Sequence, residues 1–206
     1  MNKHIKIILD RIGNDPCIFD FLQKVCNLGD LRKQVSSSLR ALPEESILDV
    51  GCGTGLYSIL AKNKYVGIDL NEAYIKYAQI KYKDKNKKFI VGDVTKIDFG
   101  DELFDKTLYL AMLHHFNEED NIRILTKISA ITRGKILILD LTIPERVNFI
   151  QSFFLKVERG RYVRSLSQQL RIIGKVLKIQ DATTILNRSK FGLFSIIDAQ
   201  PKDIKL

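Results

Sequence analysis

The chain has 206 residues, of which 45% are hydrophobic, and its formal net charge is +9. This length predicts one domain with a sizeable core, and the positive charge favours anionic surfaces or substrates as partners. We see neither a secretory signal nor a run of 18 apolar residues that could cross a membrane. Three cysteines without a C-x-x-C pair argue against a disulfide framework or a zinc site. We therefore expect a cytoplasmic protein without a metal, in which Cys17 and Cys26 are small buried apolar residues.

Residues 1–43 are expected to form a helical cap ahead of the main domain. Asp15 followed by Pro16 is typical of a helix N-cap with proline at the first helical position. A second helix is predicted over residues 31–42, because Pro43 would stop it. The sequence leaves two roles open for this segment: a cap beside a ligand pocket, or simple packing on the sheet.

A glycine-rich turn is the most informative stretch of the chain. A short apolar strand over residues 47–50 precedes Gly-x-Gly-x-Gly over 51–55, and a helix is expected over 56–62. Such a turn brings the backbone close to a ligand, and the following helix offers unpaired N–H groups to it. Asp49 would repel a pyrophosphate and would suit a positively charged ligand, so the pattern disfavours the dinucleotide fingerprint Gly-x-Gly-x-x-Gly. A turn without a ligand and an NAD-binding oxidoreductase are the alternatives.

This stretch resembles motif I of the class I S-adenosylmethionine (SAM) dependent methyltransferases. The resemblance implies that the glycine turn wraps the methionine half of SAM, with the acid of the preceding strand close to it. It also implies the following set of cofactor-binding residues: Asp49, Gly51, Cys52, Gly53, Gly55, Asp69, Leu70, Asp93, Val94 and Leu110.

Two further acids follow predicted strands. Asp69 lies in the strand over 65–70, at the spacing where nucleotide-binding folds place an acid that accepts hydrogen bonds from ribose hydroxyls. The resemblance gives it the same role for the SAM ribose. Asp93 lies in the strand over 89–94, and the resemblance implies that it accepts from the adenine amine while Val94 contributes its backbone. The alternative for Asp69 is an exposed acid at a strand end.

Two of the three histidines of the chain lie in the stretch 104–116, a predicted fourth strand and its exit loop. Imidazole can accept a proton near neutral pH. The stretch resembles the Leu-His-His motif of small-molecule and lipid-quinone methyltransferases. By that resemblance His115 faces the acceptor as a catalytic base, whereas His114 packs or bonds the backbone beside it. A purely structural role for both histidines is the alternative.

Residues 144–164 are read as an insertion at the carboxyl edge of the sheet. It could form a lid, a dimer face, a lipid patch or ordinary core. Three arginines in its last six residues would suit a phosphate or carboxylate, or form a solvated turn. We therefore expect a substrate-binding side that consists of Tyr57, His114, Arg159, Tyr162 and Arg164. The lysine-rich run over 76–88 is interpreted as a solvated helix end rather than a nucleic-acid contact.

Strands and helices alternate from residue 47 to 139, which predicts an α/β fold with a doubly wound parallel sheet. A final antiparallel hairpin is expected over 176–188 and 191–199. The resemblance implies a Rossmann-like, seven-stranded, mostly parallel sheet with the last strand antiparallel, in a SAM-binding domain over 44–206.

The predicted function is methyl transfer from SAM to a small-molecule or lipid-like acceptor, with S-adenosylhomocysteine (SAH) as the product. The arginines would also suit an anionic acceptor. An RNA-directed methyltransferase, supported by the basic balance, and a non-catalytic SAM-binding protein are the alternatives. Either a monomer or a homodimer fits the sequence.

Overall fold

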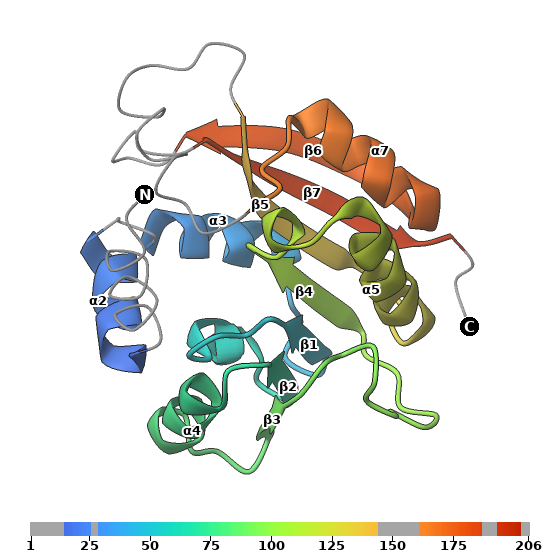
Figure 1. The fold of residues 1–206 in the computed structure, drawn as a ribbon. Coiled ribbons are helices and arrows are strands. Elements are labelled where there is room, and N and C mark those ends of the chain that lie inside the picture. The colour runs from blue at the N-terminus through green and yellow to red at the C-terminus, as the bar shows by residue number, and fades with distance from the viewer. Residues whose placement is uncertain (1–14, 26–28, 144–160, 187–192, 203–206) are drawn as a thin grey trace.

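A computed structural model describes residues 15–25, 29–143, 161–186 and 193–202. Its centre is a seven-stranded sheet in the order β3-β2-β1-β4-β5-β7-β6 (Figure 1). β7 is antiparallel to both of its neighbours, and the other neighbouring pairs are parallel. The predicted fold and the antiparallel last strand are confirmed. The strands are β1 (Ser46–Val50), β2 (Lys64–Asp69), β3 (Lys87–Val91), β4 (Lys106–Leu110), β5 (Ile136–Thr142), β6 (Leu177–Leu186) and β7 (Leu193–Pro201).

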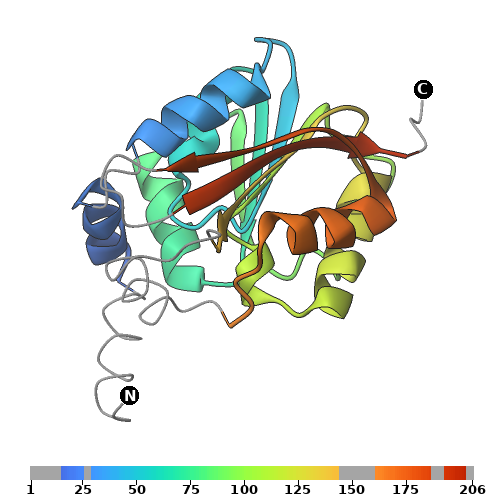
Figure 2. The same ribbon diagram turned by 90° about the horizontal axis from the view of Figure 1, so that it is seen from above.

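Helices cover both faces of the sheet, as Figures 1 and 2 show. α5 and α7 pack on one face, whereas α3 and α4 pack on the other. Successive strand residues point to opposite faces. Thus Leu48 and Val50 join the first cluster, and Ile47 joins the second. The helices are α2 (Pro16–Val25), α3 (Gly29–Leu39), α4 (Glu72–Lys81), α5 (Glu118–Ala130) and α7 (Leu166–Val176), with the 3-10 helices η1 (Leu56–Leu60) and η2 (Leu113–His115).

Because both faces are covered, ligands have access mainly at the strand ends, and in such sheets they bind at the carboxyl ends. β5 is buried at all seven positions. Three capped helix starts fix where the loops at this edge turn into helices. Asn71 caps α4, Asn117 caps α5, and Ser165 forms a capping box with Gln168 at the start of α7.

Two local predictions were wrong. The segment after the glycine turn is a short 3-10 helix that ends at Leu60, and Ala61 is already extended, so no α-helix reaches residue 62. Cys17 is exposed rather than buried, since it lies on a different side of α2 from the half-buried Phe19. The predictions for Cys26 and for residues 144–160 fall outside the described residues.

The two amino-terminal helices have different surroundings. α3 belongs to the core, where Leu31, Val35 and Leu39 are buried against the sheet. α2 lies farther out and touches α4, with the rings of Phe19 and Tyr74 5.0 Å apart. α3 therefore packs on the sheet, and α2 is the part placed to act as a cap. That residues 1–43 form a unit of their own stays a prediction.

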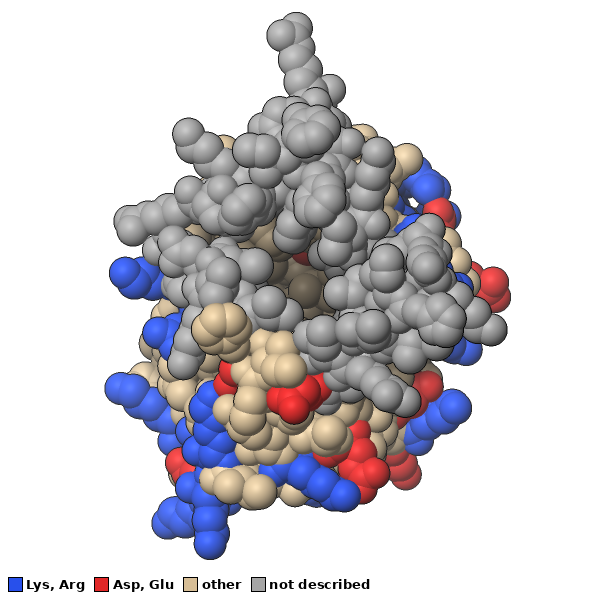
Figure 3. Space-filling model, turned by 60° about the vertical axis from the view of Figure 1, so that its left-hand side comes forward, with Lys and Arg blue, Asp and Glu red and all other residues tan. Residues whose placement is uncertain are grey.

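Basic and acidic side chains lie near one another on the face shown in Figure 3. Within the lysine-rich run, Lys76 pairs with Glu72, Lys81 with Asp20, and the more distant Lys87 with Asp84. No helix in the described part of the chain is long and apolar enough to cross a membrane.

Candidate cofactor and acceptor site

The glycine turn leaves β1 in a conformation that ordinary residues rarely adopt. All three glycines have positive φ: +77° at Gly51, +53° at Gly53 and +79° at Gly55. The N–H groups of Gly51 and Cys52 both donate to the carbonyl of Ile68, at 2.8 and 3.0 Å. These bonds tie the start of the turn to the end of β2, so the backbone lies flat at the carboxyl edge of the sheet.

The side chain of Asp69, at the end of β2, also binds the glycine turn. Its Oδ2 accepts from Gly53 N at 2.8 Å and its Oδ1 from Asn71 N at 2.8 Å. Burial raises the pKa of this carboxyl above its ordinary value. A carboxylate has about four lone-pair sites, so these two bonds leave capacity for hydroxyl donors of a ligand.

A cavity of about 320 Å³ lies beyond the carboxyl ends of β1, β2 and β3. Six of the residues singled out from the sequence line it: Gly51, Asp69, Leu70, Asp93, Val94 and His115. Sequence reasoning missed several other lining residues, among them Met112, Phe116 and Ile124. A Cβ on Gly51 would lie 2.2 Å from Met112 Sδ, so the Met112 side chain would have to move, and the φ of +77° at Gly51 also favours glycine.

Asp93 provides an ionised acceptor in this cavity. Its Oδ1 accepts from the backbone N–H of Thr95 at 2.9 Å and from the Thr95 hydroxyl at 2.7 Å. These hydrogen bonds, with a smaller effect from the charge of Lys96, hold the pKa of Asp93 below its ordinary value. Val94 is buried beside it.

Five predicted cofactor-binding residues do not line the cavity, namely Asp49, Cys52, Gly53, Gly55 and Leu110, and neither does Tyr57 from the predicted substrate side. Asp49 is 1% exposed and its Oδ2 accepts from the Tyr65 hydroxyl at 2.6 Å. Burial raises its pKa to about 7, and the charge of Asp69 adds to that effect. Cys52 and Leu110 are buried in the cluster under α3 and α4, and the half-buried Tyr57 packs against it.

The two histidines point to different places. His115 is exposed and lines the cavity, whereas His114 is 5% exposed. Their ring centroids are 4.1 Å apart. His114 Nδ1 lies 2.5 Å from Oδ1 of Asp140 on β5, and its backbone N–H donates to Oδ2 at 3.2 Å.

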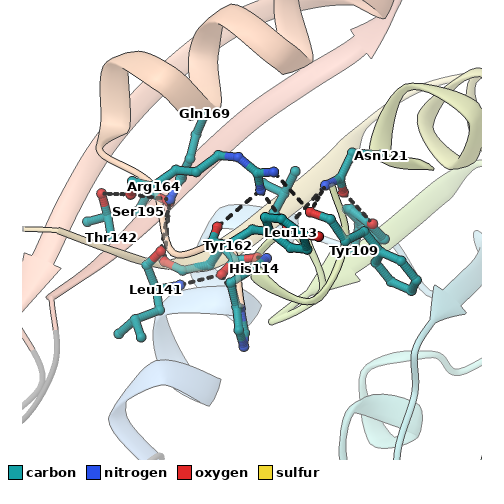
Figure 4. Close-up of polar contacts among 12 residues, drawn as sticks. Tyr109, Leu113, His114, Asn121, Leu141, Thr142, Tyr162, Arg164, Gln169 and Ser195 are labelled. Atoms are coloured by element: carbon teal, nitrogen blue, oxygen red, sulfur yellow. Dashed lines mark hydrogen bonds and ion pairs between the residues drawn. The ribbon is translucent and has the colours of Figure 1, made fainter. Parts of the chain in front are cut away.

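Arg164, expected on the substrate side, binds protein carbonyls (Figure 4). Its guanidinium donates to the carbonyls of Leu113 at 2.8 Å, Phe116 at 2.9 Å and Tyr162 at 3.1 Å. The N–H of Tyr162 donates to the carbonyl of His114 at 2.9 Å, and its side chain is 40% exposed. Both residues therefore hold the loop over residues 113–116, which is called the histidine loop below. Arg159 lies outside the described residues.

Asn121, on α5, holds the same loop. Its Nδ2 donates to the carbonyls of Leu113 and Phe116 at 3.0 Å each, and the Tyr109 hydroxyl donates to its Oδ1 at 2.8 Å. Sequence reasoning missed Asn121 and Asp140. A signal existed for Asp140, since it is the one acid in the otherwise apolar β5, and a buried carboxylate needs partners.

The described residues contain no group of three or more His, Cys, Asp or Glu side chains that could hold a metal ion. They do fit SAM. The turn offers close backbone approach, two carboxylates can accept from hydroxyl and amine donors, and the cavity volume is in the range of small-molecule sites.

Comparisons with known proteins agree with this geometry. A family model described as a methyltransferase domain matches residues 47–135. Demethylmenaquinone methyltransferase of Thermotoga maritima is 29% identical over 167 residues, which cover 75% of this chain and 70% of that protein. A tRNA (carboxymethyluridine(34)-5-O)-methyltransferase of Arabidopsis thaliana is 33% identical over 89 residues, 42% of this chain but only 21% of that protein.

Among solved structures, magnesium protoporphyrin IX methyltransferase from Synechocystis PCC 6803 with bound SAH superposes with a TM-score of 0.68. It is 21% identical and covers 87% of this chain and 86% of its own, which shows a shared fold. Fold, glycine turn and matches together define the class. These findings support a class I SAM-dependent methyltransferase with SAM as its cofactor.

Proposed function

We propose that this chain methylates a small acceptor of the quinone type, and that His115 is the base that takes the acceptor's proton. One observation carries the proposal: His115 lines the same cavity as Asp69 and Asp93, the two carboxylates expected to bind SAM. Cofactor and base are thereby brought to one place, as methyl transfer to a protonated acceptor requires.

Each cofactor-binding role follows from the local chemistry. Asp69 would accept from the ribose hydroxyls and Asp93 from the adenine amine, since both carboxylates lie in the cavity with acceptor capacity left. The backbone of Gly51 borders the cavity and would lie near the methionine half. Asp49, two residues before Gly51 and buried, would act on the positive sulfonium through its charge when its carboxyl is ionised.

When bound, SAM supplies a sulfonium methyl group for in-line transfer to a nucleophilic oxygen or carbon. The imidazole of His115 would accept the proton that the nucleophile loses as its new bond to carbon forms. The apolar side chains of Met112, Phe116 and Ile124 would exclude water from the reacting atoms.

The acceptor class is supported by the Thermotoga relative, whose name gives demethylmenaquinone as its substrate. The apolar residues of the cavity lining suit a flat ring of this kind. An anionic acceptor has less support, because the guanidinium of Arg164 is engaged with three backbone carbonyls. That option now rests on the net charge and on Arg159.

The test combines calorimetry with SAH and a turnover assay in which a short-chain demethylmenaquinol is the acceptor. We expect His115→Ala to lower kcat by about 10²- to 10⁴-fold, the usual contribution of a positioned base, with SAH affinity unchanged. Glu119→Ala, an exposed residue four positions away on α5, is the matched control and should keep full activity. Equal loss of SAH binding in His115→Ala would contradict the role of base.

An RNA acceptor is the second candidate, because the Arabidopsis relative acts by name on a tRNA. Total tRNA as acceptor, at low and raised salt, tests it. Salt-sensitive methyl incorporation into tRNA, without turnover of the quinol, would favour this candidate. Binding of SAH without turnover of either acceptor would favour a non-catalytic SAM-binding protein.

A further inference from the structure

A buried carboxylate–imidazole pair lies directly behind the histidine that lines the cavity. Asp140 is fully buried on β5, so its charge must be compensated and its oxygens hydrogen-bonded. Oδ1 meets His114 Nδ1 at 2.5 Å and accepts from Leu141 N at 2.6 Å, and Oδ2 accepts from His114 N at 3.2 Å. One carboxylate therefore holds both the ring and the backbone of His114.

A cationic side chain other than His114 lies near Asp140. The guanidinium of Arg164, which binds three backbone carbonyls, is close enough for the charge of Asp140 to act on it. A neutral His114 can bond to the carboxylate through an Nδ1–H group. In a neutral imidazole, one nitrogen carries the proton and the other is an acceptor. An ionised carboxylate at Nδ1 requires the proton there, which leaves Nε2 as the acceptor nitrogen.

The backbone around the pair is also fixed. The carbonyls of Leu113 and Phe116, on either side of the two histidines, each accept from both Arg164 and Asn121 (Figure 4). With the loop fixed from α5 and from segment 161–164, the bond to Asp140 helps to orient the His114 ring. The ring of His115 lies against that ring at 4.1 Å and borders the cavity.

We propose that Asp140 is a positioning residue for the methyl transfer: it holds His114 as the Nδ1–H tautomer, and the His114 ring in turn orients His115 at the cavity. This inference rests on the proposed role of His115. The inference gives a residue of β5 a part in aligning the base.

The first experiment reads the tautomer in the unmodified protein. Histidine is labelled with ¹⁵N, SAH is added, and two-bond ¹H–¹⁵N correlations are recorded between pH 7 and 8, with His114 assigned from the spectrum of His114→Gln. We expect the Nδ1–H form of His114. The Nε2–H form, or an imidazolium with both nitrogens protonated, would overturn the proposal. The reading requires neither an acceptor nor turnover, so failure of the proposed function does not affect it.

The second experiment uses Asp140→Asn, whose amide is nearly isosteric but has one acceptor oxygen in place of two. We expect kcat with the quinol to fall about 100-fold, as for a base displaced by about 1 Å, while the dissociation constant of SAH stays within about twofold. The pH profile of kcat should also change, which a loss of folded protein alone would not cause. Asp198→Asn on β7, where the acid pairs with Lys135 instead, is the matched control.

An unchanged kcat in a folded Asp140→Asn variant, or a parallel loss of SAH binding, would overturn the proposal. If this variant does not fold, the tautomer measurement on the unmodified protein still decides. If His115→Ala keeps full turnover, the assignment of the base fails, and the NMR result then stands or falls separately.

Discussion

The cofactor half and the acceptor half of the site are built from bonds of different range. At the ends of β1 to β3, the bonds of the two cavity carboxylates join residues close in sequence: Asp93 to Thr95 two residues on, and Gly53 to Asp69 sixteen residues on. Around η2, the bonds from Asp140 and Arg164 span more chain, 26 residues from His114 to Asp140 and 51 from Leu113 to Arg164.

This difference teaches where each half obtains its rigidity. The cofactor half gets it from turns and strand ends, so a short motif suffices to build it. The acceptor half depends in addition on partners far away in sequence, on β5 and in segment 161–164, as the bonds of Asp140 and Arg164 show. A change in one half should therefore leave the other half's function intact.

The largest effect on cofactor binding is expected from Asp69→Ala. The variant removes the acceptor for Gly53 N and the proposed ribose contact together, and we expect SAH affinity to fall about 100-fold. Calorimetry with SAH measures it. The exposed Asp101→Ala is the control and should bind as the unmodified protein does. An unchanged dissociation constant for Asp69→Ala would refute the ribose assignment.

A smaller effect is expected on the pH dependence of stability through Asp49. Its folded-state pKa is raised from 3.8 to about 7, so the protonated carboxyl stabilises the fold below about pH 4. That stabilisation is lost as the pH rises through about 7. Asp49→Asn has no such titration. The melting temperature of the variant minus that of the unmodified protein should therefore be about 5 °C larger at pH 8 than at pH 5. Thermal melts at both pH values measure it. A difference that does not depend on pH would contradict the assignment.

A third prediction tests whether α2 assists the glycine turn. Asp20 on α2 accepts from the Thr54 hydroxyl at 2.6 Å and from the Tyr77 hydroxyl at 3.0 Å, and it pairs with Lys81. We expect Asp20→Ala to weaken SAH binding about five- to tenfold, roughly the free energy of one charge-assisted hydrogen bond. Calorimetry is again the measurement, with Asp15→Ala at the start of α2 as a helix-capping control. Equal weakening in both variants would indicate that α2 has merely lost stability.

The smallest effect is expected at Glu118, which joins α5 to Arg171 and Lys175 of α7 at the surface. These partners lower its pKa from 4.5 to about 2, so its stabilising effect is present above about pH 4.5 and is lost as the pH falls towards 2. Solvent screening keeps exposed pairs weak. Glu118→Gln should lower the melting temperature at pH 7 by only about 1–2 °C, with kcat unchanged. A loss of kcat would instead indicate that this surface pair helps to hold the acceptor half of the site rigid.

Much of the cofactor half could be predicted from residues alone. Gly51, Asp69, Asp93 and Val94 line one cavity, because parallel strands bring their carboxyl ends to one edge, and their binding of SAM stays a prediction. Asp49 and Leu110 were expected beside the ligand and instead face the buried cluster or its hydrogen bonds. The sequence places Asp49 and Leu110 at or near the ends of their strands. It does not say which face of the strand each side chain takes.

The acceptor half was predicted only in outline. The two histidines could be singled out, and Arg164 was expected to face a ligand, yet its guanidinium binds three backbone carbonyls of the protein. Asp140 and Asn121 were missed, because a lone polar residue in a strand or helix does not reveal a partner many residues away.

The sequence by itself determined the order of strands and helices, the cofactor class and the identity of the glycine turn. These depend on local periodicity, on caps and on the backbone freedom of glycine, which act over a few residues. Only the tertiary structure decided that His114 bonds Asp140 while His115 lines the cavity, and that Arg164 holds the loop between them. Such contacts arise when buried polar groups from distant segments satisfy one another, and the packing of the whole sheet sets which groups meet.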